Sequence, residues 1–446
     1  MALMKREKRK NVAFAFEKKS GVGKRVLLAQ NRVNCDCYGG KLQANLGYAQ
    51  MSKADGGAQV CNLDGVEKIV EIKVYDSAKK TYEERFGVLT GAGEFYEQES
   101  KDGAFFRSAS GLRDADVFRF AGEDFRYTLA FIGEDSCLYR RDNGTFDVAV
   151  FQKTAKAGCY LRHRVFVGVK PSELACSAPE REMNFTESVH EGGLLRFPSV
   201  GGEIVGLKSF QNSLYLFFEH GIMKVNAVGA IKDFTVEELV YAGGKIYGKS
   251  LCVGKNGIYF MASDGAYCFD GKNAERLFEG MVELPKEETS KERSAAFFGR
   301  ILMRYYTQTG YKTLVVYEDG KECYYVDGLP IFTAEEGGRC LFTDKNGVIC
   351  QLCEGGENCF DGSFLGAQTD FGVAGRKTLT KLHFVGKGSF VLRVKTSGRN
   401  FAREVVFQDG VAEVRISEPG ETFTFDFLLS GGTVIDGMRA ELLVAS

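Results

Sequence analysis

Short apolar segments alternate with polar turns through the middle of the chain. Four of them share one plan, in which an apolar strand runs into a polar turn that ends in glycine, and a second apolar strand follows. They occupy residues 213–221, 257–265, 312–320 and 339–347. Each closing glycine follows His, Asp or Asn, and such pairs tolerate the positive φ of hairpin turns. The pattern therefore predicts a series of β-hairpins.

The spacing of these hairpins indicates a repeat. The closing glycines, at positions 221, 265, 320 and 347, lie about 42 residues apart on average, and a four-stranded propeller blade takes about 40–45 residues. Their uneven spacing indicates divergent blades. Related apolar stretches at 71–76, 127–133 and 163–169 extend the series upstream. We expect an irregular six- or seven-bladed β-propeller; a pair of β-sandwiches is the alternative, because sandwiches also contain irregularly spaced hairpins.

The pattern changes after residue 361. Apolar and polar residues alternate more regularly there, as in 423–427 and 438–444, and this alternation is typical of strands with one buried and one wet face. The predicted division is an arm with the first strands over 1–59, the β-propeller over 60–361 and a small antiparallel β-sandwich over 362–446. The charged segment 283–297 predicts either one short solvated helix or a charged loop between two blades.

Composition supports an all-β chain and excludes several classes of protein. The 446 residues include 54 Gly, 36 Phe, 6 Pro and no Trp, and the formal net charge is -1. Glycine with aromatic runs suits many short strands, and a near-zero charge attracts neither nucleic acid nor a membrane. No apolar stretch is long enough to span a bilayer, and none follows the basic start as a secretory signal requires. The 13 cysteines, an odd number, indicate reduced thiols and synthesis in a reducing cytoplasm.

Motifs for cofactors and metals are incomplete. Residues 20–25 (Ser-Gly-Val-Gly-Lys-Arg) are similar to a phosphate loop, but Lys18 and Arg25 stand where glycine and a hydroxyl are needed. Cys350 and Cys353, with Cys359 and the pair at 35 and 37, have a spacing close to that of zinc ligands. No histidine lies near them, so structural thiols are the favoured interpretation. We expect no cofactor and no metal.

Catalytic motifs are also missing, and we expect no enzymatic activity. The four histidines, at 163, 190, 220 and 383, fall at predicted turns or strand edges, which favours capping or solvent-exposed roles. No Gly-x-Ser-x-Gly elbow occurs. A propeller glycoside hydrolase would bring paired carboxylates and sugar-stacking tryptophan, and the lack of tryptophan weakens that alternative without removing it.

The basic start is the one charged segment that stands out. Its cations are Lys5, Arg6, Lys8, Arg9 and Lys10. They are candidates for assembly contacts, either with an acidic neighbouring subunit or, nonspecifically, with DNA phosphates; plain solvation of a mobile terminus is the alternative.

Two segments are similar to a known family. Residues 25–48, with Asn31 before a Gly39-Gly40 turn and then Gly47-Tyr48, resemble the opening segment of bacteriophage virion propellers. Residues 201–276 resemble the same family, which includes the packaged-DNA stabilisation proteins of short-tailed phages. These proteins form a ring in the tail machine and have no catalytic residues to carry over.

The resemblance implies a non-enzymatic structural component of a phage or prophage particle, in a tail or head–tail ring. Its partners would be other virion proteins and copies of itself in a homo-oligomeric ring, without membrane contact, and it would be made in the host cytoplasm and reside in the virion. A carbohydrate- or protein-binding propeller on a cell surface and a propeller glycoside hydrolase remain the alternatives.

Overall fold

The computed structural model describes most of the chain. The described residues are 7–16, 25–26, 29–51, 61–101, 103–121, 127–133, 137–149, 154–182, 184–186, 192–197, 201–289, 292–320, 322–327, 329, 333–334, 339–344, 346–355 and 358–445. Their regular structure is β, apart from the short 3-10 helices η1 (Tyr38–Gly40), η3 (Ile231–Asp233) and η4 (Gly248–Ser250). This confirms the all-β prediction. Within these residues no helix is long and apolar enough to cross a membrane.

The chain folds into two compact units. The propeller unit comprises residues 50–320 and 329–351, and the terminal unit comprises 1–49, 321–328 and 352–446. This division differs from the expected 1–59, 60–361 and 362–446. Strand β1 (Glu7–Ala15) pairs antiparallel with β41 (Val434–Ala445), so the N-terminal strand belongs to a sheet built largely from the C-terminal residues. The described part of the N-terminus is therefore not a separate arm.

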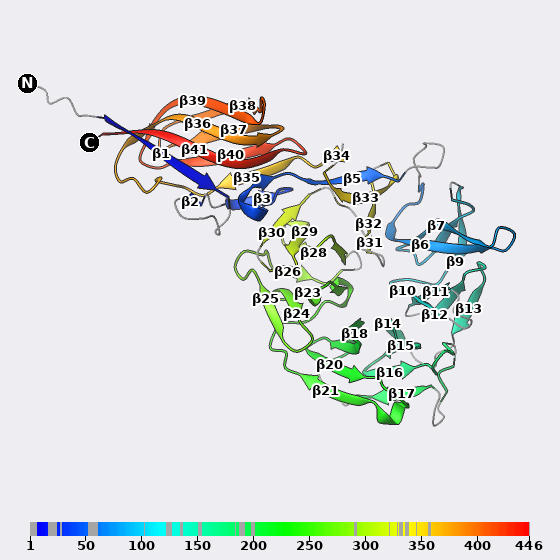
Figure 1. The fold of residues 1–446 in the computed structure, drawn as a ribbon. Coiled ribbons are helices and arrows are strands. Elements are labelled where there is room, and N and C mark those ends of the chain that lie inside the picture. The colour runs from blue at the N-terminus through cyan, green and yellow to red at the C-terminus, as the bar shows by residue number, and fades with distance from the viewer. Residues whose placement is uncertain are drawn as a thin grey trace, which may run out of the picture. The chain divides into compact units, whose positions relative to one another are not determined.

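Five consecutive four-stranded antiparallel sheets make up most of the propeller unit (Figure 1). The first contains β6 (Val66–Asp76), β7 (Thr81–Thr90), β8 (Phe95–Gln98) and β9 (Phe105–Ala109). The second contains β10 (Asp116–Ala121), β11 (Tyr127–Ile132), β12 (Cys137–Arg141) and β13 (Phe146–Ala149), and the third β14 (Ala155–Leu161), β15 (Arg164–Val169), β16 (Glu173–Cys176) and β17 (Gly193–Arg196). The fourth contains β18 (Ile204–Phe210), β19 (Ser213–Phe218), β20 (Gly221–Asn226) and β21 (Thr235–Leu239), and the fifth β22 (Cys252–Val253), β23 (Ile258–Ala262), β24 (Gly265–Phe269) and β25 (Ala274–Leu277).

Two further strand groups complete this unit. One consists of β26 (Pro285–Glu287), β27 (Arg293–Phe297), β28 (Arg300–Thr307) and β29 (Gly310–Tyr317), and the other of β31 (Thr333–Ala334), β32 (Cys340–Thr343) and β33 (Ile349–Glu354). The expected helix or loop at 283–297 is wrong for 293–297, because these residues pair with β28 along their whole length. Ala295 and Phe297 are buried while Ser294 and Ala296 between and before them are half-buried, which suits a strand with one more fully covered face.

The sheets pack face to face around a ring. Phe95 of the first sheet contacts Phe131 of the second, with ring centroids 4.6 Å apart, and Phe217 of the fourth contacts Phe260 of the fifth at 5.7 Å. From β10 through β14 and β18 to β22, the first strand of one sheet lies beside the first strand of the next, β27 lies beside β22 and β31, and β31 lies beside β6. Hydrogen bonds from Lys68 to Val117 and from Arg119 to Glu71 join β6 and β10. A shared cluster that includes Val88 and Leu341 closes the circle. Successive sheets that pack in a closed ring are the blades of a β-propeller.

The four glycine-terminated hairpins fall in four different strand groups, as a propeller requires. Their first strands belong to β19, β23, β29 and β32. Gly320 and Gly347 have φ of 68° and 76°, the left-handed conformation expected for the turns, whereas Gly221 does not.

The terminal unit contains two sheets around one hydrophobic core. In the first sheet the order is β2 (Arg25–Val26), β1, β41, β36 (Lys377–Lys387) and β39 (Val411–Gly420), with β4 (Leu42–Gln43) also on β41. The second contains β30 (Cys323–Val326), β3 (Ala29–Val33), β35 (Gly362–Gly366), β40 (Thr424–Leu429), β37 (Ser389–Lys395) and β38 (Asn400–Val406). Strand β5 (Leu46–Gln50) pairs with β34 (Asn358–Cys359). Phe384 of the first sheet and Phe427 of the second meet in the core.

Candidate functional site

A pocket lies along the first strands of five successive sheets in the propeller unit. Strands β6, β10, β14, β18 and β22 all contribute to its walls, together with one residue of β11, and its volume is about 340 Å³. The first strands line the centre of a propeller, so this pocket belongs to the central channel. Its charged and hydroxyl-bearing side chains are Lys68, Asp116, Arg119, Tyr160, Lys208 and Ser209.

Hydrogen bonds to the backbone hold several of these side chains against the walls. The Lys68 ammonium donates to the carbonyl of Val117 at 3.3 Å, and the Arg119 guanidinium donates to the carbonyl of Glu71. Asp116 accepts a hydrogen bond from the N–H of Gly158 at 3.2 Å. These bonds join the first three sheets and orient three charged groups around one space.

Lys208 lies close to two buried thiols. Burial raises the pKa of Cys159 to about 11 and that of Cys252 to about 12, and the positive charge of Lys208 opposes both shifts. Both thiols are therefore protonated at neutral pH, and a protonated thiol is a poor nucleophile and a poor metal ligand. The pocket consequently holds ammonium and guanidinium groups next to neutral sulfur.

Elsewhere in the propeller unit, the half-buried carboxylate of Glu288 lies near the buried carboxyl group of Glu292. Glu288 accepts a hydrogen bond from the N–H of Lys249 at 3.2 Å, and Glu292 accepts one from the N–H of Thr289 at 3.2 Å. Glu292 is 0% exposed, and its second carboxylate oxygen has no hydrogen-bond partner among the described residues. Burial, with the neighbouring Glu288 carboxylate, raises the pKa of Glu292 to about 8. The carboxyl group of Glu292 is therefore not accessible to a polymeric substrate in this structure.

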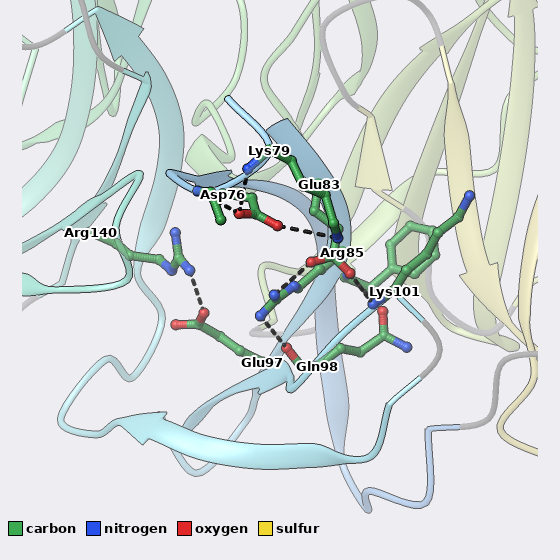
Figure 2. A network of polar contacts seen from close by, with 10 residues as sticks. Asp76, Lys79, Glu83, Arg85, Glu97, Gln98, Lys101 and Arg140 are labelled. Atoms are coloured by element: carbon green, nitrogen blue, oxygen red, sulfur yellow. Dashed lines mark hydrogen bonds and ion pairs between the residues drawn. The ribbon is translucent and has the colours of Figure 1, made fainter. Parts of the chain in front are cut away.

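A buried ion pair links the first two sheets (Figure 2). Arg140 of β12 donates to Glu97 of β8 at 2.6 Å, and the two residues are 1% and 4% exposed. Arg140 also donates to the carbonyl of Arg141. Figure 2 shows further pairs on the first sheet, including Arg85 with Glu83 at 2.7 Å. An ion pair that is buried between two sheets in this way has a structural role, because it connects the sheets.

The basic residues singled out in the sequence lie only partly within the described structure. Lys5 and Arg6 lie outside the described residues. Lys8, Arg9 and Lys10 are exposed on β1, and Arg9 lies 3.7 Å from Glu441 of β41. The prediction of an arm that precedes the first strand is therefore wrong for these three residues, because the pairing of β1 with β41 already satisfies their backbone.

The cysteines considered as zinc ligands are free thiols, and three of them donate to backbone carbonyls. Cys35 donates to the carbonyl of Ser363, Cys350 to that of Val348 and Cys353 to that of Gly355. Burial raises the pKa of Cys350 to about 11. Within the described part of the chain no three Cys, His, Asp or Glu side chains are grouped as metal ligands. The glycine-rich loop at 20–24 lies outside the described residues.

The structure places His220 in a turn, as predicted, whereas His383 lies in the interior of a strand and not at its edge. His163 and His220 are exposed in turns, and His383 lies on β36 with its Nδ1 atom 3.6 Å from Glu413. His190 lies outside the described residues. None of the three described histidines lines the channel pocket.

Sequence reasoning did not find the channel residues. Arg119 stands between two phenylalanines, and Lys208 stands between Leu207 and Ser209, in the segments Phe-Arg-Phe and Leu-Lys-Ser-Phe. A charge inside an apolar strand is the only local signal, and it does not distinguish a residue that faces a channel from one that faces solvent.

Searches against protein families and against curated proteins found no match. Among solved structures, the chain is similar to a streptogramin B lyase at 10% identity and a TM-score of 0.46, over 70% of this chain and 98% of that one. The WD40 domain of Neurospora crassa Pan2 is 11% identical with a TM-score of 0.45, over 70% and 97%. BamB from Moraxella catarrhalis is 14% identical with a TM-score of 0.40, over 68% and 99%. With TM-scores below 0.5, these neighbours say nothing about function. The arrangement of its own sheets makes this chain an all-β protein that contains a β-propeller.

Proposed function

We propose that this chain is a non-enzymatic structural component of a phage or prophage particle, acting through protein–protein contacts in a tail or head–tail ring. The proposal includes a seven-bladed propeller, counted from the five complete sheets and the two further strand groups, and a β-sandwich formed by the two sheets of the terminal unit. The observation that carries it is the broad outer face of the terminal unit.

This outer face is formed by β1, β41, β36 and β39. Outward side chains on the four strands lie in cross-strand rows set by the register. One row contains Asn11, Glu441, Lys381 and Arg415, and the next contains Ala13, Arg439, His383 and Glu413. Charges of both signs therefore occur in neighbouring positions on this surface, which supports recognition of a partner with a matching pattern.

Exposed apolar side chains lie at one end of this face and on the neighbouring strand β38. Val385, Val406 and Val411 are more than half exposed and line a groove of about 1150 Å³ that runs between β38 and the four strands. Interfaces combine an apolar centre with a polar, charged rim, and this surface offers both. Stable interfaces bury about 1,200–2,000 Å² in total, and ring assembly repeats one such contact by rotation.

The basic residues of β1 add a second feature that supports assembly. Lys8, Arg9 and Lys10 are exposed beside the charged rows, and Lys5 and Arg6 precede them in the chain. In the proposed particle these cations contact an acidic neighbour or DNA phosphates. The chain resides in the virion and is made in the host cytoplasm.

Native mass spectrometry of the full chain tests the proposal. We expect a closed oligomer, and we expect Val406→Asp combined with Val411→Asp to shift it to monomer, because a buried unpaired carboxylate opposes the contact. Val240→Asp is the matched control, since Val240 is 88% exposed in the propeller unit.

Sedimentation with particles supplies the second measurement. The protein should appear in purified virions of the phage or induced prophage. A chain that stays monomeric at high concentration and is absent from particles would refute the virion role, and binding to a glycan array by that monomer would favour the cell-surface alternative.

A further inference from the structure

We propose that the open edge of strand β1 binds an acidic segment of a partner protein, which adds to the sheet of the terminal unit as a further strand. The inference deepens the proposed assembly role, on which it rests, by naming the kind of neighbour that this edge accepts. On one side, β1 pairs with β41 along residues 7–14 (Figure 1). On the other side, β2 pairs only with Phe14 and Ala15. Among the described residues no strand covers that side of residues 7–13, and this side is the open edge.

The backbone of an open edge favours a polypeptide as the ligand. Unpaired N–H and C=O groups alternate along such an edge, and an extended segment of another chain supplies both of the complementary groups. A nucleic-acid backbone presents phosphate oxygens, which accept hydrogen bonds and donate none. Phosphates would therefore satisfy only the N–H groups, whereas a polypeptide strand satisfies the whole edge.

Three consecutive cations determine the chemistry of the added strand. Lys8, Arg9 and Lys10 are all exposed. Val12 and Phe14 are buried in the core, and side chains alternate between the two faces of a strand. Lys8 and Lys10 therefore lie on the core side of β1, and Arg9 lies on the opposite side. Opposite charges in directly facing positions of two neighbouring strands stabilise the pair, so the partner should carry three successive acidic residues.

The cations are available to such a partner. The side chain of Arg9 is 80% exposed, and it lies 3.7 Å from Glu441. No ion pair links Lys8 or Lys10 to any of the described residues. The same charges oppose pairing between the β1 edges of two copies, because like charges in facing positions destabilise a strand pair. The edge therefore selects an acidic strand over a second copy of itself.

Fluorescence anisotropy with a labelled nine-residue peptide tests the site on the full chain. The peptide has three central glutamates and Thr-Val-Thr on each side, so that a valine faces Val12 when the glutamates face the cations. We expect saturable binding that weakens as salt is added. Lys8→Glu combined with Lys10→Glu should weaken it about tenfold or more, because attraction becomes repulsion. Lys232→Glu with Lys272→Glu, the same charge change at exposed positions of the propeller unit, is the matched control.

A second peptide separates strand addition from charge attraction alone. It has the same residues with N-methylated amides throughout, so it keeps the three glutamates and loses the N–H groups that pair with a strand edge. We expect it to bind about tenfold more weakly or worse than the first peptide.

Four results would overturn the proposal. They are no saturable binding of the first peptide up to about 1 mM, equal affinity for the two peptides, unchanged affinity in the variant with both Lys8→Glu and Lys10→Glu, and tighter binding of a single-stranded DNA oligonucleotide of equal charge. Native mass spectrometry of the same sample without peptide measures assembly separately. A closed oligomer that binds no peptide refutes only the edge site, whereas peptide binding by a chain that stays monomeric and is absent from particles refutes only the assembly role.

Discussion

The two units distribute hydrophobic and charged groups in different ways. The core of the terminal unit is one continuous cluster, rich in phenylalanine, between two sheets, and its charged rows lie on the outside. The described part of the propeller unit has separate apolar clusters at five of the junctions between neighbouring sheets. It buries charged groups such as Glu97, Arg140 and Glu292.

The difference follows from how many faces of each sheet are covered. A sheet in a two-layer unit has one covered face, so its charges stay on the open face. A propeller sheet is covered on both faces by its neighbours, and its first strand faces a narrow channel, so some of its charges become buried and need partners. Lys377 shows the same requirement in the terminal unit: it is buried, and its ammonium donates to the carbonyls of Asp370, Val373 and Glu421.

The largest expected effect is on the continuous core. Phe427→Ala should lower the free energy of unfolding by about 4 kcal/mol, because it removes a fully buried ring and leaves a cavity. The ring contacts those of Phe16, Phe364, Phe384 and Phe390. Denaturant unfolding measures the loss, and Phe298→Ala, at a ring that is 71% exposed, should change stability little. A loss below about 1 kcal/mol would mean that this core is loosely packed.

The second largest loss of stability should come from breaking the buried ion pair between Arg140 and Glu97. Arg140→Met should cost about 3 kcal/mol, because Glu97 is left as a buried charge without its cation. The double variant Arg140→Met with Glu97→Gln should recover much of that loss, as measured in a double-mutant cycle. If the losses of stability in the two single variants simply add up in the double variant, Arg140 and Glu97 do not stabilise the fold as a pair.

The buried carboxyl group of Glu292 should make the free energy of unfolding depend on pH. The pKa of Glu292 is raised to about 8 in the folded protein from 4.5, so the folded state holds a proton that the unfolded state releases. Stability should therefore be greatest below about pH 4.5 for this group and fall as pH rises towards 8, with a slope of at most about 1.4 kcal/mol per pH unit. The difference between wild type and Glu292→Gln isolates this contribution in urea titrations at pH 5 to 8. A difference that does not change with pH would show that Glu292 is already ionised in this range.

The smallest change in stability should come from substitutions on the open face of the terminal unit. Lys381 contacts Glu413 at 2.6 Å, and both side chains are partly exposed. Lys381→Met should change the melting temperature by less than about 2 °C, because exposed pairs are screened by solvent. Differential scanning calorimetry of Lys381→Met and Arg140→Met under the same conditions compares the two changes in melting temperature. A loss as large as that of Arg140→Met would mean that the outer face is covered in solution.

Much of the fold could be predicted from the sequence. Period-two alternation and glycine-terminated turns predicted the all-β class, and the hairpins at 213–221 and 257–265 correspond to β19–β20 and β23–β24. These features are local, since a turn and its two flanking strands lie within ten or twelve residues. The change of pattern near residue 361 likewise marked a second kind of sheet.

Only the tertiary structure decided which distant strands meet and which charges become buried. The pairing of β1 with β41 joins the two ends of the chain, and no local pattern encodes it. Segment 283–297 suggested a solvated element because it is charged, yet Glu292 is fully buried. Lys208 became a channel residue only because five sheets bring their first strands together. The physical reason is that alternating apolar and polar residues show only that the two faces of a strand differ. Whether a face is buried depends on the sheet that packs against it, and the closure of the ring decides which sheet that is.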